Sequence, residues 1–267
     1  MTDTSTHAAP SMAGFERTEH DVGGVRTVVH AIGSGPPLVY LHGTGTFTGF
    51  EMARPWAEGR RVIVPYHPNF GDSGDDPSID TVEDYVLHYL DLFDALGLGT
   101  FDLAGHSLGG WLAAEIAIRQ PARVRRLVLV APAGLVVPEA PAPGLLDIQP
   151  QELPGYLTHD PAVAASYFPA APDPAFGERL GREVGGFAQL IRADPQGDPK
   201  LPRWAHRISM PTLVLWGAED RLRPTAQGAA WVKLLPDARL ALVPATGHLV
   251  FEETPAAGRI VTDFLAG

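Results

Sequence analysis

GHSLG at residues 105–109 is the strongest indication of fold and chemistry in this chain. It follows the apolar run 101–104, which predicts a buried strand, and precedes the alanine-rich run 112–119, which predicts a helix. A serine at such a sharp turn is held in a strained conformation that exposes its hydroxyl, and the flanking glycines let strand and helix approach each other. The helix start also favours negative charge. We therefore predict that Ser107 is a nucleophile.

The composition is that of an ordinary globular chain. Its 267 residues suffice for one large α/β domain with an inserted subdomain. The net charge of -11 argues against nucleic acids and anionic membranes as partners. The chain has no cysteine, which excludes disulfides and a cysteine nucleophile.

Residues 1–13 are expected to be disordered and show no signal-peptide pattern. No apolar run is long enough to span a membrane. A cytoplasmic location is therefore expected.

Apolar runs of strand length alternate with helical patterns along most of the chain. The predicted strands are residues 15–22, 25–31, 37–41, 61–65, 101–104, 124–130, 212–216 and 239–243. The predicted helices are residues 80–96, 112–119, 226–235 and a final one after residue 254. The first two strands suit a hairpin, and the continuous apolar runs suit parallel strands buried on both faces. The alternation predicts an α/β fold with a mostly parallel sheet and helices on both faces.

Two helix starts are predicted in residue detail. Asp80 and Glu83 have the spacing of a capping box at the start of the helix 80–96. Thr254 is the expected N-cap of the final helix, with Pro255 at its first position.

The alternation breaks between residues 132 and 207. This stretch holds half of the 26 prolines and offers short helical pieces, such as 161–168 capped by Asp160, but no convincing strand. We predict a small helical insertion over the sheet, with residues 1–131 and 208–267 as the core. The aromatic side chains of the insertion either line a pocket or pack its own small core: Tyr156, Tyr167, Phe168, Phe176 and Phe187.

A serine nucleophile needs a base, and the base needs an acid to orient it. His248 follows the last predicted strand, and Asp220 follows the strand before it. The carboxyl ends of parallel strands meet at one sheet edge, where ligands collect. The order Ser107, Asp220, His248 suits a catalytic triad on this topology. Glu219 stays open as the alternative acid.

With these motifs the chain resembles the α/β-hydrolase superfamily, from about residue 25 to the end. The motifs that carry the resemblance are the His42-Gly43 turn, the turn 70–73, the elbow at 105–109, the loop 217–220, and Gly247-His248 followed by Glu252. The resemblance implies that the insertion is a cap domain and favours Asp220 as the acid. It also implies an oxyanion hole formed by the backbone N–H groups of Thr44 and Leu108.

The other histidines have structural interpretations. His106 is expected to pack beside the nucleophile, and His42 to lie under the oxyanion turn. His67, His159 and His206 are expected to be surface or satisfied residues, and Trp111 to belong to the core or the pocket wall. No metal-binding motif is present, and neither a metal nor a cofactor is expected.

The chain departs from the superfamily pattern at three positions. Tyr66 and Asn69 stand where an acidic residue and a glycine are usual, which suggests a differently shaped pocket. The carbon–carbon hydrolases of aromatic degradation often have a tryptophan directly after the triad histidine, where this chain has Leu249. A serine nucleophile disfavours the haloalkane dehalogenases and epoxide hydrolases of this fold, which use aspartate.

We therefore expect a serine hydrolase that cleaves a carboxylic ester or lactone through an acyl-enzyme. The expected partner is a small apolar molecule, and a homodimer stays open as the assembly state. Two alternatives also remain open: hydrolysis of a carbon–carbon bond in a vinylogous diketone, and a non-catalytic receptor that binds a small molecule on this fold.

Overall fold

All eight predicted strands form, and they lie in one sheet. The computed structural model describes residues 12–267, so the predicted disorder of residues 1–13 lies almost wholly outside the described residues. The strands are β1 (Glu16–Val22), β2 (Val25–Gly33), β3 (Pro37–Leu41), β4 (Arg61–Pro65), β5 (Phe101–His106), β6 (Val124–Val130), β7 (Thr212–Gly217) and β8 (Ala238–Val243). The predicted ends that differ do so by one or two residues.

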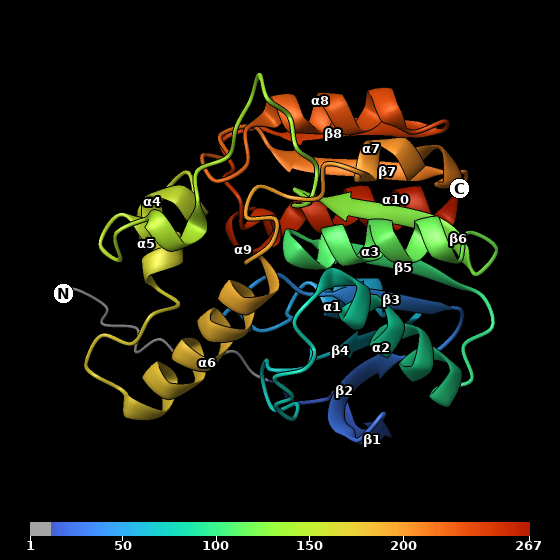
Figure 1. Ribbon diagram of the computed structural model, residues 1–267, viewed down its shortest axis with the longest axis horizontal. Helices are drawn as coiled ribbons and strands as arrows, with labels where there is room; N and C mark the ends of the chain where they lie inside the picture. The colour runs from blue at the N-terminus through green and yellow to red at the C-terminus, as the bar shows by residue number, and fades with distance from the viewer. Residues whose placement is uncertain (1–11) are drawn as a thin grey trace.

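The order of the sheet is β1-β2-β4-β3-β5-β6-β7-β8 (Figure 1). β1 and β2 form the expected antiparallel hairpin, and β2 also pairs antiparallel with β4. Every pairing from β4 to β8 is parallel. The predicted fold class, a mostly parallel α/β sheet, is confirmed.

Helices cover both faces of the sheet. Those outside residues 132–207 are α1 (Ala53–Trp56), α2 (Val82–Ala95), α3 (Leu108–Arg119), α8 (Thr225–Leu234), α9 (Val250–Glu253) and α10 (Gly258–Ala266). One buried cluster joins the sheet to α2, α3 and α8, and a second joins its other face to α1, α9 and α10. The two clusters explain why most strands read as continuous apolar runs, since both faces of the sheet are buried.

The helix starts differ from the predictions. The capping box of α2 lies one residue further on: the Thr81 hydroxyl accepts from Asp84 N at 3.2 Å, and the Asp84 carboxylate accepts from Thr81 N at 3.0 Å. Glu83 instead pairs with Arg119 of α3. Thr254 is no side-chain cap, because its hydroxyl bonds the Thr246 hydroxyl at 2.7 Å, and a 3₁₀ turn over Pro255–Ala257 precedes α10.

Residues 132–207, called the insert below, contain helices and turns. The helices are α4 (Leu153–Leu157), α5 (Pro161–Ala165), α6 (Pro174–Leu190) and α7 (Leu201–Trp204). Asp160 caps α5 as predicted, although this helix ends at Ala165 rather than at residue 168. The expectation of short helical pieces was wrong for α6, which runs for 17 residues.

The insert lies at the end of the sheet where reactive loops are expected. Figure 1 shows the arrows of β6 and β7 pointing toward the side on which α4, α5 and α6 lie. This side is therefore the edge where the parallel strands end at their carboxyl termini. Within residues 12–267 no helix is long and apolar enough to cross a membrane.

Candidate active site

Ser107 occupies the strained turn that the sequence predicts. It lies between β5 and α3 with φ 53° and ψ -114°, a conformation that a non-glycine residue rarely adopts. A Cβ at Gly105 would collide with the backbone of Gly109, and a Cβ at Gly109 would collide with the backbone of Leu41. The two glycines therefore permit the close approach of strand and helix that the turn requires.

The three residues predicted as a triad come from the loops after β5, β7 and β8, at this edge of the sheet. His248 Nδ1 donates to Asp220 Oδ2 at 2.8 Å, and both side chains are almost fully buried. Ser107 and His248 line the same cavity. The carboxylate at Nδ1 fixes that nitrogen as the protonated one, which leaves Nε2 as the acceptor. Nε2 is buried and has no hydrogen-bond partner among residues 12–267.

The surroundings of the two candidate acids differ. Asp220 is 7% exposed, and its Oδ1 accepts from the backbone N of Leu222 at 2.9 Å and of Arg223 at 2.8 Å. These bonds fix the carboxylate while its other oxygen faces His248. Glu219 is exposed to solvent. The geometry therefore favours Asp220 over Glu219.

A carboxylate that the sequence did not single out holds the histidine loop. Glu253 accepts from the backbone N of Gly247 at 2.6 Å, of His159 at 2.9 Å and of Asp160 at 2.7 Å. It thereby joins the loop before His248 to the start of α5 in the insert. The motif that follows His248 in the sequence singles out the neighbouring residue, Glu252. The side chain of Glu252 lines the cavity, whereas Glu253 is not among the lining residues.

The two expected oxyanion donors lie beside Ser107. Thr44 lines the cavity together with Ser107, and the loop at Gly43 passes so close that a Cβ there would lie 3.5 Å from the Cβ of Ser107. Leu108 is the first residue of α3, where backbone N–H groups have no acceptor within the helix.

The cavity has a volume of about 450 Å³ and a largely apolar wall. The insert contributes Phe168 and Phe187 to its lining, whereas Tyr156, Tyr167 and Phe176 are not among the lining residues. Glu252 lies in the wall and accepts from the Thr48 hydroxyl at 3.1 Å. Burial raises the pKa of Glu252 above its usual value. No lysine or arginine is found among the described residues that line this cavity.

The histidines near the site make structural hydrogen bonds. His106 Nε2 donates to the carbonyl of His248 at 3.0 Å, and burial lowers the pKa of His106 to about 3. His42 Nδ1 donates to the carbonyl of Gly43 at 2.7 Å, and burial lowers the pKa of His42 to about 4. His67 is fully buried and donates from Nε2 to the carbonyl of His42 at 2.8 Å. Neutral imidazoles thus support the loops on both sides of Ser107.

The two unusual residues of the loop after β4 lie outside the cavity lining. Asn69 adopts φ 69°, a left-handed conformation that asparagine tolerates in place of glycine. Its side chain accepts from Asp76 N at 2.8 Å and so closes the loop. Tyr66 packs against His30 and His42. Both residues shape the loop rather than the cavity wall.

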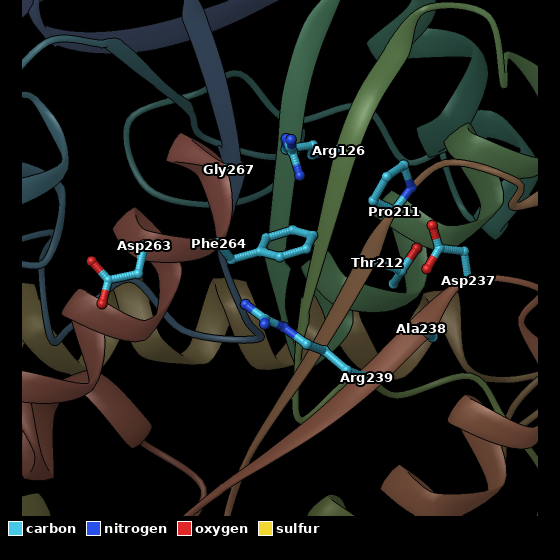
Figure 2. Close-up of a pocket in the computed structure, with 9 residues that line it drawn as sticks. All are labelled: Arg126, Pro211, Thr212, Asp237, Ala238, Arg239, Asp263, Phe264 and Gly267. Atoms are coloured by element: carbon cyan, nitrogen blue, oxygen red, sulfur yellow. The ribbon is translucent and has the colours of Figure 1, made fainter.

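A second pocket lies at the opposite edge of the sheet (Figure 2). It is lined at the starts of β7 and β8 by Thr212 and Ala238, and the guanidinium groups of Arg126 and Arg239 lie 5.5 and 5.3 Å from the Phe264 ring. It contains neither Ser107 nor His248. Within the described residues, no group of three or more histidine, aspartate or glutamate side chains is placed to hold a metal ion.

Comparisons with known proteins identify the family and the fold. A model of the alpha/beta hydrolase family matches residues 38–258. A 2-hydroxymuconate semialdehyde hydrolase of Pseudomonas putida is 31% identical over 91% of this chain and 92% of its own length. A 2-hydroxy-6-oxo-2,4-heptadienoate hydrolase of Pseudomonas putida F1 is 29% identical over 91% of this chain and 94% of its own length. The crystal structure of a bacterial membrane phospholipase A, described as a virulence factor, superposes with a TM-score of 0.81 at 25% identity, over 96% of this chain and 87% of that one.

Proposed function

The chain belongs to the alpha/beta hydrolase family, and from this premise we propose that it hydrolyses a neutral, largely apolar carboxylic ester or lactone through an acyl-enzyme on Ser107. The observation that carries the choice of substrate is the wall of the cavity beside Ser107. It is largely apolar, its acidic residue is Glu252, and it has no lysine or arginine among the described residues. A site that bound an anion would need a cation or a set of donors to replace water.

The proposed reaction has two steps, acylation of Ser107 and hydrolysis of the acyl-enzyme, and the three residues of the triad act in both. Ser107 Oγ attacks the carbonyl carbon while His248 Nε2 takes the hydroxyl proton, and Asp220 stabilises the resulting imidazolium. The N–H groups of Thr44 and Leu108 donate to the oxyanion, each worth about 3 kcal/mol of barrier. The intermediate collapses as His248 returns the proton to the leaving alcohol. Water then repeats the sequence on the acyl-enzyme, releasing the acid and restoring Ser107.

The named relatives favour a second candidate, hydrolysis of a carbon–carbon bond in a product of aromatic ring cleavage. The two Pseudomonas putida relatives carry such substrates in their names, and these names support this reaction better than they support ester hydrolysis. The same triad serves both reactions. However, these substrates are carboxylates, and in this chain the cavity wall presents Glu252 rather than a cation. Leu249 also stands where the carbon–carbon hydrolases often have tryptophan.

The experiment that separates the candidates measures kcat/KM of the wild-type protein on two substrate classes. One is a series of p-nitrophenyl esters from acetate to decanoate, and the other is 2-hydroxy-6-oxo-2,4-heptadienoate, followed by the loss of its visible absorbance. A mock preparation from host cells without the gene measures background turnover. The proposal predicts turnover of the esters with at least about tenfold higher kcat/KM than that of the dienoate, since unpaired burial of a carboxylate is unfavourable.

The reverse preference would overturn the ester proposal in favour of carbon–carbon hydrolysis. Tight binding of either class without repeated turnover would overturn both and favour a receptor on this fold.

A further inference from the structure

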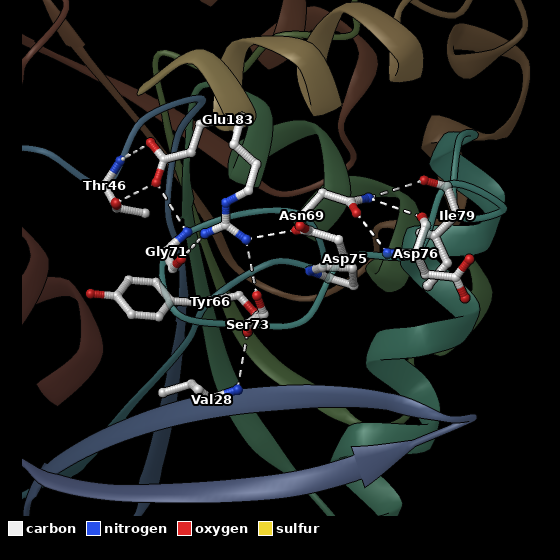
Figure 3. A network of polar contacts seen from close by, with 12 residues as sticks. Val28, Thr46, Tyr66, Asn69, Gly71, Ser73, Asp75, Asp76, Ile79 and Glu183 are labelled. Carbon is white, nitrogen blue, oxygen red and sulfur yellow. Dashed lines mark hydrogen bonds and ion pairs between the residues drawn. The ribbon is translucent and has the colours of Figure 1, made fainter. Parts of the chain in front are cut away.

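A buried carboxylate of the insert is hydrogen-bonded to the loop beside the proposed oxyanion hole (Figure 3). Glu183 of α6 is 1% exposed. Its Oε2 accepts from the backbone N of Thr46 at 3.0 Å, and its Oε1 accepts from the Thr46 hydroxyl at 2.6 Å and from Gly71 N at 3.0 Å. Burying a carboxylate is unfavourable unless several donors replace its water, and here three donors do so.

The bonds of Glu183 hold the segment that follows Thr44, together with the Thr48–Glu252 hydrogen bond and the packing of Phe47 on Phe168. Thr46 comes two residues after Thr44, and Gly43, Gly45 and Gly49 give this segment few side chains with which to pack. The Thr46 carbonyl closes the turn by accepting from Gly49 N at 3.1 Å. Both donors of Thr46, its backbone N–H and its hydroxyl, point to Glu183, so α6 holds the residue that lies two positions after Thr44.

The neighbouring Arg182 holds the same helix on the core. Its guanidinium donates to the carbonyl of Gly71, to the carbonyl of Ser73 at 3.1 Å and to Asp75 at 2.6 Å. Ser73 Oγ in turn donates to the carbonyl of Tyr66 and accepts from Val28 N, each at 3.0 Å (Figure 3). The loop after β4 therefore connects α6, which carries Glu183, to strand β2 of the sheet.

We propose that Glu183 is a positioning residue that sets the oxyanion hole, so that the hole is fully formed only when α6 of the insert is seated on the core. The inference rests on the proposed function of Ser107. Oxyanion donors must be placed accurately, because a displacement of about 1 Å at a catalytic group lowers rates by about 10²-fold. The carboxylate acts on the reaction through the Thr44–Thr46 segment and touches no reacting atom.

The test uses an alkyl fluorophosphonate and the full-length protein. Ser107 Oγ attacks phosphorus, fluoride leaves, the hydroxyl proton passes to His248, and the phosphoryl oxygen needs the oxyanion donors. The inactivation rate constant and the half-saturating concentration are measured separately for wild type, Glu183→Gln and Thr46→Val. Glu178→Gln is the matched control, because Glu178 is exposed on the same helix. Thr46→Val removes one donor and leaves the bond between Glu183 and Gly71 N in place.

We expect Glu183→Gln to lower the inactivation rate constant about tenfold, with the half-saturating concentration within twofold of wild type. Thr46→Val should lower the same constant by a smaller factor, and the double variant should be no slower than Glu183→Gln, since both act through one contact. If Glu183→Gln does not fold, Thr46→Val decides alone. Glu178→Gln should match wild type.

Two results would overturn the inference. The first is an unchanged rate constant in both variants. The second is a rise in the half-saturating concentration and a lower melting temperature with no loss of rate, which would make Glu183 a purely structural contact. Failure of the wild type to react would contradict the proposed function itself, and is thereby distinguished from failure of the role of Glu183.

Discussion

At the scale of single residues, the acidic side chains around Ser107 differ in what they contact, and the contacts decide what each can do. Asp220 directs one oxygen at His248 while backbone N–H groups hold the other. Glu253 and Glu183 accept hydrogen bonds from loops and make none with the side chain of Ser107 or of His248. Glu252 lies in the cavity wall with a raised pKa. Of these four acids, Asp220 is the one that hydrogen-bonds His248, which is the geometry of an orienting acid.

Asp220→Asn should therefore lower kcat on a p-nitrophenyl ester by about 10³- to 10⁴-fold, because the amide neither fixes the tautomer of His248 nor stabilises its imidazolium. Glu219→Gln, a matched change at the exposed neighbour, should leave kcat within about twofold, as surface substitutions usually do. Steady-state kinetics on the two purified variants check both values. Loss of activity in Glu219→Gln with retention in Asp220→Asn would assign the acid to the other residue.

At the scale of elements, the sequence predicts best what depends on local pattern. The strands and the elbow follow from apolar runs and from the glycines around Ser107, and the structure has them within one or two residues. The proposed triad follows from chain order and from the edge at which parallel strands end. The α2 capping box lies one residue later than predicted, and Glu83, its predicted member, pairs instead with Arg119 on another helix, a contact that no local pattern contains.

The helix α6 and its contacts show where sequence reasoning ends. Gly177, Gly181, Gly185 and Gly186 lower the intrinsic helix propensity of this segment, so it reads as short pieces. Tertiary packing compensates for this loss, since Glu183, Phe187 and Leu190 lie on one buried face. Glu183 meets Thr46 across 137 residues of sequence, and a charged residue in a helix normally indicates a solvated face. Its position became apparent only in the folded chain.

At the scale of the whole molecule, buried neutral histidines make stability depend on pH. Burial lowers the pKa of His42 and His88 to about 4 and that of His106 to about 3, and it holds the pKa of His67 well below its ordinary value. Below pH 6.5 the unfolded chain binds protons on these residues that the folded chain does not, so stability falls as pH decreases toward 4. Raised carboxyl pKa values, as at Glu252, act in the opposite direction but belong to fewer groups.

We expect the free energy of unfolding to decrease between pH 6.5 and pH 4, by about 1.4 kcal/mol per pH unit for each such histidine. His88 lies on α2, away from the cavity, and bonds the Thr27 hydroxyl at 2.9 Å. His88→Gln should therefore reduce the slope of the unfolding free energy against pH by the contribution of about one proton. It should leave kcat at pH 7 unchanged. Urea unfolding of wild type and variant at pH 7.0, 6.0 and 5.0 measures the slopes. Parallel pH profiles would show that His88 does not contribute.

The role of Ser107 as the nucleophile of a serine hydrolase is tested by kcat/KM on p-nitrophenyl butyrate, measured for wild type and Ser107→Ala prepared in parallel. We expect kcat/KM to fall by about 10⁴- to 10⁶-fold in the variant, with its melting temperature within a few degrees of wild type. Equal turnover in the two proteins would contradict the assignment of Ser107, and with it the proposed reaction.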